Sequence, residues 1–117
     1  MTDPEQFVSC VSHVIRIYNQ KTGKTVVIQP SGIVVRSSSA HINAREVGDI
    51  PVCEIEYGRV SHLPPFKAGV GLIVSAVCVQ RILDQFPDRT DIYTVDGQVR
   101  CARTGEVLGC KGLIHWR

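Results

Sequence analysis

Arginines beside predicted turns are the residues of this chain with the clearest binding chemistry. Guanidinium groups bind phosphate through planar, bidentate hydrogen bonds, which a lysine cannot form. Tyr57 precedes Gly58 and offers an aromatic face on which a base can stack. The alternative, ordinary surface arginines and a core tyrosine, stays open for each residue taken alone. The arginines in or beside predicted loops and turns are Arg36, Arg45, Arg59, Arg89, Arg100 and Arg103.

Ser75 adds a second kind of anion-binding group. It follows the apolar run VGLIV and precedes a helical pattern, so it is the predicted N-cap of a helix. Free amides in the first helical turn carry partial positive charge and can bind an anion, although most helix starts bind only water or their own cap. The predicted ligand-binding residues are Tyr57, Arg59, Ser75, Arg89, Arg100 and Arg103.

A conventional cofactor site is not indicated. Gly69 and Gly71 form the start of a glycine fingerprint, but the third glycine is missing and the pair precedes the predicted strand. A dinucleotide site needs its glycines after the strand, where the phosphate meets the start of the helix. The phosphate-binding lysine motif is absent from the sequence as well. No cofactor is therefore predicted.

Metal binding and nucleophilic catalysis are not indicated either. Cys10 and His13 are three residues apart, so on a strand they face opposite sides and do not converge. Cys101 and Cys110 lack the second short pair of ligands that a zinc site normally has. The sequence contains no nucleophile elbow. We therefore predict no metal and favour a binding protein over an enzyme, with a small hydrolase left open.

The composition limits the cellular setting. The 117 residues carry a formal net charge of +2, which is too small to predict nucleic-acid binding. Five cysteines, an odd number, follow an acidic and polar start that is unlike a secretory signal. A reducing, cytoplasmic location is expected, the host cytoplasm if a phage encodes the chain. We expect five free thiols.

A strand followed by a helix is the best-defined predicted element. Residues 70–75 are a short apolar run suited to a buried strand, and a helix is predicted at about residues 75–86, ending before Pro87. Charged residues interrupt the apolar run too early for a membrane span. The core residues predicted here are Leu72, Val74, Val79, Leu83 and Phe86.

The other segments predict strands and turns. Residues 7–19 are predicted as one half-buried strand, and residues 25–29 and 33–36 as a hairpin. Residues 37–45 are polar and predict a loop, and the following stretch predicts a strand up to about residue 60. Short strands are predicted around two turns in residues 91–116. The expected fold is α+β, a mainly antiparallel sheet with one packed helix in a single globular domain spanning residues 1–117.

A resemblance covers residues 50–113. The segments IPV and YG, an LP loop, a glycine before IVS, an R-x-D cluster and a final glycine-rich strand resemble a family of short, uncharacterised bacteriophage and prophage proteins. One departure is that this chain lacks a proline between the R-x-D cluster and the next arginine. The matching positions are Ile50, Tyr57, Gly58, Leu63, Pro64, Gly69, Ile73, Val74, Ser75, Arg89, Asp91, Arg100, Gly105, Gly109 and Leu113.

The resemblance implies a phage-associated setting, but it does not indicate a reaction or a ligand. Combined with the arginines, it predicts a phage or prophage accessory protein that sequesters a phosphate-bearing nucleotide signal of host defence. The expected partner is a nucleotide-like small molecule bound by a homo-oligomer, with no membrane partner. The alternative is a protein-interaction or structural module that docks on a host or virion protein.

Overall fold

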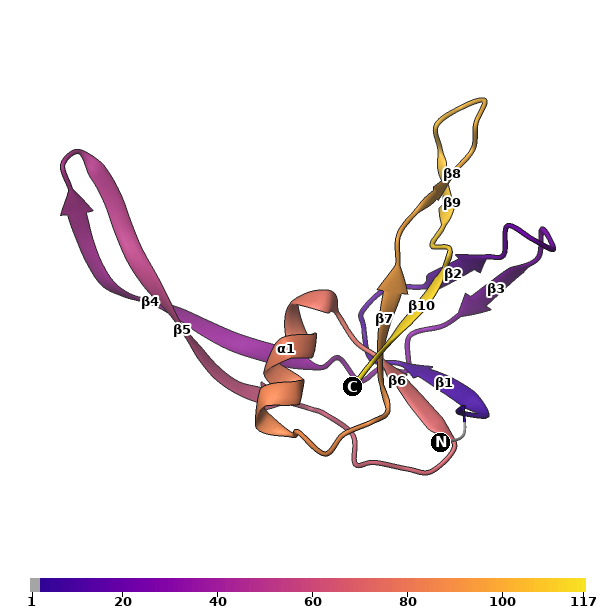
Figure 1. Ribbon diagram of the computed structural model, residues 1–117, viewed down its shortest axis with the longest axis horizontal. Coiled ribbons are helices and arrows are strands. Elements are labelled where there is room, and N and C mark those ends of the chain that lie inside the picture. The colour runs from indigo at the N-terminus through magenta and orange to yellow at the C-terminus, as the bar shows by residue number, and fades with distance from the viewer. Residues whose placement is uncertain (1–2) are drawn as a thin grey trace.

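Four short strands form the central sheet of the computed structural model, which describes residues 3–117 (Figure 1). In spatial order they are β1 (Gln6–Ser9), β6 (Val70–Ile73), β7 (Ile92–Asp96) and β10 (Gly112–Trp116). β6 is parallel to both β1 and β7, and β10 is antiparallel to β7. The carboxyl ends of β1, β6 and β7 therefore lie along the same edge of the sheet.

The helix α1 (Ala76–Gln85) connects β6 to β7. A parallel pair needs such a crossover, because a tight turn cannot bring the chain back to the starting edge. Ser75 occupies the N-cap with an extended backbone, as predicted, but its hydroxyl makes no capping hydrogen bond. Phe86 is the C-cap, and Pro87 follows it. The predicted strand and helix of this region are confirmed.

Two hydrophobic clusters flank the sheet, because successive residues of a strand face opposite sides. Leu72 and Val74 contribute to the cluster on the helix side, together with Cys78, Val79 and Ile82 from α1. The cluster on the other side contains Val11, Ile15, Ile73, Tyr93 and Cys110. Both clusters meet at β6, whose last three residues are buried.

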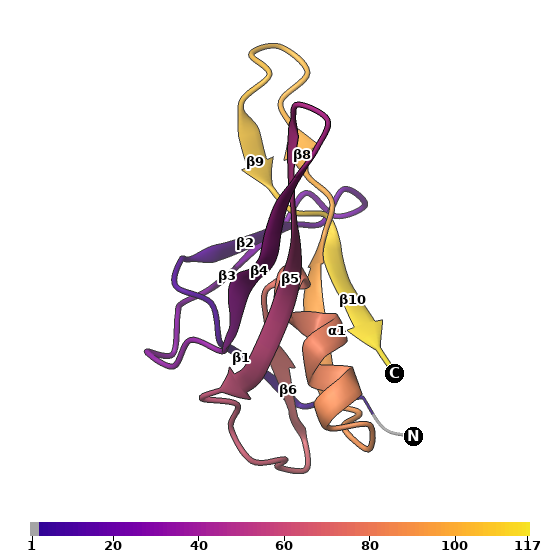
Figure 2. The same cartoon turned by 90° about the vertical axis from the view of Figure 1, so that its left-hand side faces the viewer.

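The remaining strands form three antiparallel hairpins: β2 (Ile15–Tyr18) with β3 (Thr25–Ile28), β4 (Arg36–Val47) with β5 (Ile50–Ser61), and β8 (Val99–Arg100) with β9 (Val107–Gly109). The β4–β5 arm projects from the body, away from the other two hairpins (Figures 1 and 2). The radius of gyration is 17.5 Å, well above the roughly 13 Å of a compact domain of this length.

Several predicted elements were wrong. Residues 7–19 are not one strand, because the chain leaves the sheet after Ser9 and begins β2 at Ile15. Residues 37–45 belong to β4 and are not a loop, while residues 33–35 are not a strand. Phe86 is 40% exposed and lies outside the core. The buried face of α1 is formed by Cys78, Val79 and Ile82, and Leu83 packs against it from the side.

The fold class agrees with the α+β expectation in outline. One helix accompanies ten strands in the described part of the chain. Four strand pairs are antiparallel, but the central sheet is mixed because its other two pairs are parallel. Within residues 3–117, no helix combines the length and the apolar character that crossing a membrane requires.

Candidate functional site

A pocket of about 670 Å³ lies at the carboxyl edge of the parallel strands. Residues 10–13 follow β1 and form one wall, while Val74, Ser75 and the start of α1 form a second. The root of the β4–β5 arm, at residues 36–38, closes a third side. In open parallel sheets this edge is where ligands bind, because loops and helix starts converge there.

Polar groups in this pocket suit an oxygen-rich ligand. The amino end of α1 opens into it, and the helix dipole makes this end partially positive. The Ser37 hydroxyl oxygen is buried and has no hydrogen-bond partner among the described residues. An unsatisfied buried hydroxyl costs about 1–3 kcal/mol, but this oxygen is shielded from solvent and does not face the open pocket. The hydroxyl side chains lining the pocket belong to Ser12, Ser37, Ser38, Ser61 and Ser75.

The rest of the pocket wall is apolar. Val11 and Val35 are buried beneath it, and Val77 stands at its edge with 82% of its surface exposed. His13 and Arg36 are exposed and also line the pocket. A ligand with an apolar or planar body and an anionic end matches this distribution, because each part would find a complementary surface.

Cys10 lines the same pocket as a neutral thiol. Burial raises the pKa of Cys10 above its ordinary value of 9.0, although the Ser31 side chain lowers it to a smaller extent. The thiolate is the nucleophilic form of cysteine, so a raised pKa disfavours attack on a ligand. The pocket is therefore better suited to binding than to covalent chemistry at Cys10.

Only Ser75 among the predicted site residues lies in this pocket. Tyr57 and Arg59 lie together in a different place, a groove of about 480 Å³ between β5 and the end of α1. The Arg81 guanidinium lies 3.4 Å from the centre of the Tyr57 ring, so it covers one face of the ring, and Tyr57 remains 50% exposed. The arrangement holds the arm against the helix.

Gln85 strengthens that attachment. Its side-chain oxygen accepts a hydrogen bond of 2.9 Å from the Val60 amide, and its nitrogen donates one of 3.1 Å to the Gly58 carbonyl. The side-chain amide thus pairs with the outer edge of β5 as a neighbouring strand would. Gln85 and Arg81 together fix the root of the arm on α1.

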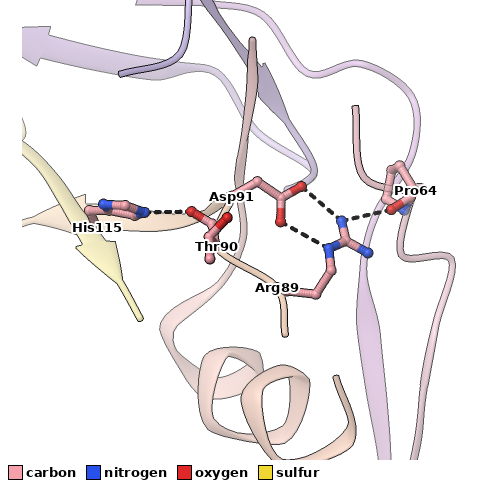
Figure 3. Close-up of polar contacts among 5 residues, drawn as sticks. All are labelled: Pro64, Arg89, Thr90, Asp91 and His115. Carbon is pink, nitrogen blue, oxygen red and sulfur yellow. Dashed lines mark hydrogen bonds and ion pairs between the residues drawn. The ribbon is translucent and has the colours of Figure 1, made fainter. Parts of the chain in front are cut away.

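Arg89 forms a largely buried ion pair inside the protein (Figure 3). Its Nε and one terminal nitrogen each donate to the Asp91 carboxylate at 2.9 Å, and the same terminal nitrogen donates to the Pro64 carbonyl at 2.9 Å. Asp91 is 4% exposed, and its own carbonyl accepts from the Leu72 amide. These contacts tie the loop after β5 to the segment that enters β7.

Arg100 and Arg103 belong to the β8–β9 hairpin. Arg100 donates to the Gly105 carbonyl at 2.9 Å and to the Gln98 side chain at 3.1 Å, so it stabilises the turn. Arg103 is exposed at the tip. The six predicted residues therefore occupy four separate places: the pocket, the groove, the buried ion pair and the β8–β9 hairpin.

The residues that sequence reasoning missed are those that the fold gathers around Ser75. Ser12 and His13 follow β1, and Ser37 and Ser38 begin β4. The sequence signal for these residues is that they are polar and follow an apolar strand. This signal indicates a shared site only once the strands are known to be parallel, because their carboxyl ends then lie on the same edge. Among the described residues, no group of three or more potential metal ligands is assembled.

Comparison with models of protein families, with curated proteins and with solved structures finds no match.

The cysteines differ in accessibility, which predicts a labelling pattern. Cys53 is exposed and Cys101 partly exposed, whereas Cys10, Cys78 and Cys110 are buried. Hydrogen bonds, the largest from the Thr104 side chain, lower the pKa of Cys101 and favour its reactive thiolate. We expect a thiol reagent to modify Cys53 and Cys101 in the native protein, and all five cysteines after unfolding without reductant. Peptide mass spectrometry checks this, and a mass indicating a disulfide in the unfolded sample would contradict it.

Proposed function

We propose that the protein binds a small phosphate-bearing molecule in the pocket at the carboxyl edge of β1, β6 and β7. The observation that carries this proposal is the meeting of three strand ends and the start of α1 around one cavity. The phosphate would lie at the first turn of α1, beside Ser75, where amides and dipole favour an anion.

A nucleotide is the ligand class that we favour. The volume of about 670 Å³ falls within the range of about 300–1,000 Å³ typical of small-molecule sites. A base would pack on the apolar wall near Val35 and Val77, and hydroxyl groups of a sugar would meet the exposed Ser12 and Ser38. Arg36 and His13, at the rim, would add donors to the phosphate. We therefore propose a site centred on Ser75 in preference to the predicted arginine site.

The biological role that we propose follows the sequence resemblance. A phage or prophage accessory protein would sequester a nucleotide signal of host defence and leave it chemically unchanged. The protonated Cys10 thiol supports binding without turnover.

A charge placed at Ser75 tests the site. Ser75→Asp is expected to weaken binding at least about tenfold, because its carboxylate would repel a phosphate at the start of α1. Ser75→Asn keeps a capping side chain without the charge and serves as the matched control. Both residues are good N-caps, so neither change should lower the unfolding midpoint.

The measurement is calorimetry with a panel of cyclic dinucleotides, cyclic trinucleotides and cyclic ADP-ribose isomers, followed by chromatography of the recovered ligand. Binding that Ser75→Asp weakens at least about tenfold and Ser75→Asn leaves unchanged supports the proposal. No binding by any member would contradict the nucleotide assignment. Recovery of a cleaved product would show that the protein is an enzyme.

A second candidate function is docking on a host or virion protein. The observation favouring it is the β4–β5 arm, which extends beyond the body and leaves Val47, Ile50 and Ile55 exposed (Figure 1). Exposed apolar side chains on a projecting ribbon are typical of a protein-contact surface. Retention of a partner by the wild-type protein, lost on replacing Ile50 with Glu and unaffected by Ser75→Asp, would favour this function.

A further inference from the structure

We infer that the β4–β5 arm is an exchange arm, which docks on the β2–β3 and β8–β9 hairpins of a second copy of this chain. From residue 43 to residue 56, every residue except Val52 is exposed. A two-stranded ribbon that buries almost nothing is only marginally stable in water. The distal arm therefore has little within its own chain to stabilise it, whether or not a ligand is bound in the pocket.

The arm is acidic and the rest of the chain is basic. Residues 43–57 contain four carboxylates, those of Glu46, Asp49, Glu54 and Glu56, against one arginine, Arg45. The whole chain carries a formal charge of +2, so the remaining residues carry a surplus of positive charge. Because the distal arm is acidic and the body basic, an arm would be attracted to the body of another copy.

The positive charge is concentrated on the two short hairpins. Residues 15–28 contain no carboxylate, and residues 97–111 contain only Glu106. The two segments together carry six basic residues: Arg16, Lys21, Lys24, Arg100, Arg103 and Lys111. This surface lies on the side of the body away from the arm, so an arm meets it most directly on a second molecule (Figure 1).

The two hairpins form one continuous surface. The Tyr18 amide donates to the Cys110 carbonyl and the Cys110 amide donates to the Arg16 carbonyl, both at 2.8 Å. A side chain at Gly109 would collide with the Arg16 carbonyl, so glycine permits this close approach. A groove of about 280 Å³ runs between the hairpins and is lined in part by Val107 and Leu108.

Both the tip of the arm and the groove between the two short hairpins carry exposed apolar side chains. Val47 and Ile50 flank the turn at the end of the arm and are 57% and 66% exposed. Val95, Val107 and Leu108 are exposed apolar residues that line the groove, and Val26 is exposed on β3. The arm tip of one copy would fill the groove of the other, with acidic side chains around it facing basic ones. A two-fold axis would let both arms bind at once, which closes the assembly as a dimer.

Charge reversal with compensation tests the inference. The arm variant is Glu46→Lys with Asp49→Lys, and the body variant is Lys21→Glu with Arg103→Glu. Each variant alone is expected to raise the dimer dissociation constant at least about tenfold, because like charges would then face each other. An equimolar mixture is expected to restore a heterodimer, since each arm then meets a body of opposite charge.

The readout is sedimentation velocity of the full chain over a wide concentration range, with circular dichroism to confirm folding. The matched control is Glu5→Lys with Asp88→Lys, which makes the same charge change at exposed positions outside the proposed interface. The control should sediment as the wild type. A monomeric wild type at every concentration, a dimer insensitive to both reversals, or a mixture that stays monomeric would overturn the inference.

Discussion

Replacing Asp91 with alanine is expected to lower the free energy of unfolding by about 3–5 kcal/mol, because it leaves the charge of Arg89 unpaired in a largely buried site. The Asp91 carboxylate accepts two hydrogen bonds from Arg89, and its side chain is 4% exposed (Figure 3). The Pro64 carbonyl satisfies one donor but does not neutralise the charge. Urea unfolding followed by circular dichroism measures the change.

Asp84→Ala is the matched control for this carboxylate. The carboxylate of Asp84 lies 3.9 Å from Arg81 on the surface of α1, where an ion pair is worth about 0–1 kcal/mol. If Asp91→Ala costs no more than Asp84→Ala, then the Arg89–Asp91 pair does not hold the loop to the sheet. Arg89→Lys should also destabilise, since an ammonium cannot form both bonds to the carboxylate and one to Pro64 in the same geometry.

Ile82→Ala is expected to cost about 2–5 kcal/mol, the usual range for removing a fully buried aliphatic side chain. Ile82 is 0% exposed and packs in the cluster between α1 and the sheet. Val77→Ala is the control on the same helix, because Val77 is 82% exposed and alanine favours a helix. Thermal unfolding compares the two, and equal midpoints would contradict the core position of Ile82.

The strand and helix at residues 70–85 could be predicted because their signals are local. An apolar run, a serine at the helix start and Pro87 after the helix leave few other structures. The face of the helix that is buried was less certain, since Val79, Leu83 and Phe86 form an apolar stripe that could equally well pack on the sheet. In the structure, Cys78 and Ile82 join Val79 on the buried face and Phe86 is left outside, which depends on contacts distant in sequence.

The first strand and β4 show what local signals cannot provide. Residues 7–19 alternate without a glycine or proline, so nothing in them marks the break after Ser9. The carbonyls of Ser9 and Cys10 accept from the Ser31 and Val35 amides, so residues 31–35 hold this turn. β4 is polar on both faces because its ribbon is exposed to solvent on both faces, and the alternation that predicts a strand is absent.

The candidate site was only partly predictable for the same reason. Ser75 was found from its own segment, as the residue between a strand and a helix. Ser12 and Ser37 join it only because β1 runs parallel to β6, a pairing that residue spacing does not indicate. Arg89 was predicted to bind phosphate only because it is an arginine beside a predicted turn. In the sequence, an arginine that binds an internal carboxylate looks the same as one that binds phosphate.

The parallel pairing of Gln6 with Val70 determines when the sheet can assemble during synthesis. A ribosome adds about 5–20 residues per second, so the emerging β1 segment waits for seconds before its partner strand exists. β6, α1 and β7 are contiguous and close a much shorter loop, which favours their early association. Within the central sheet, β1 can therefore be captured only after β6 has emerged, and β10 is the last strand to arrive.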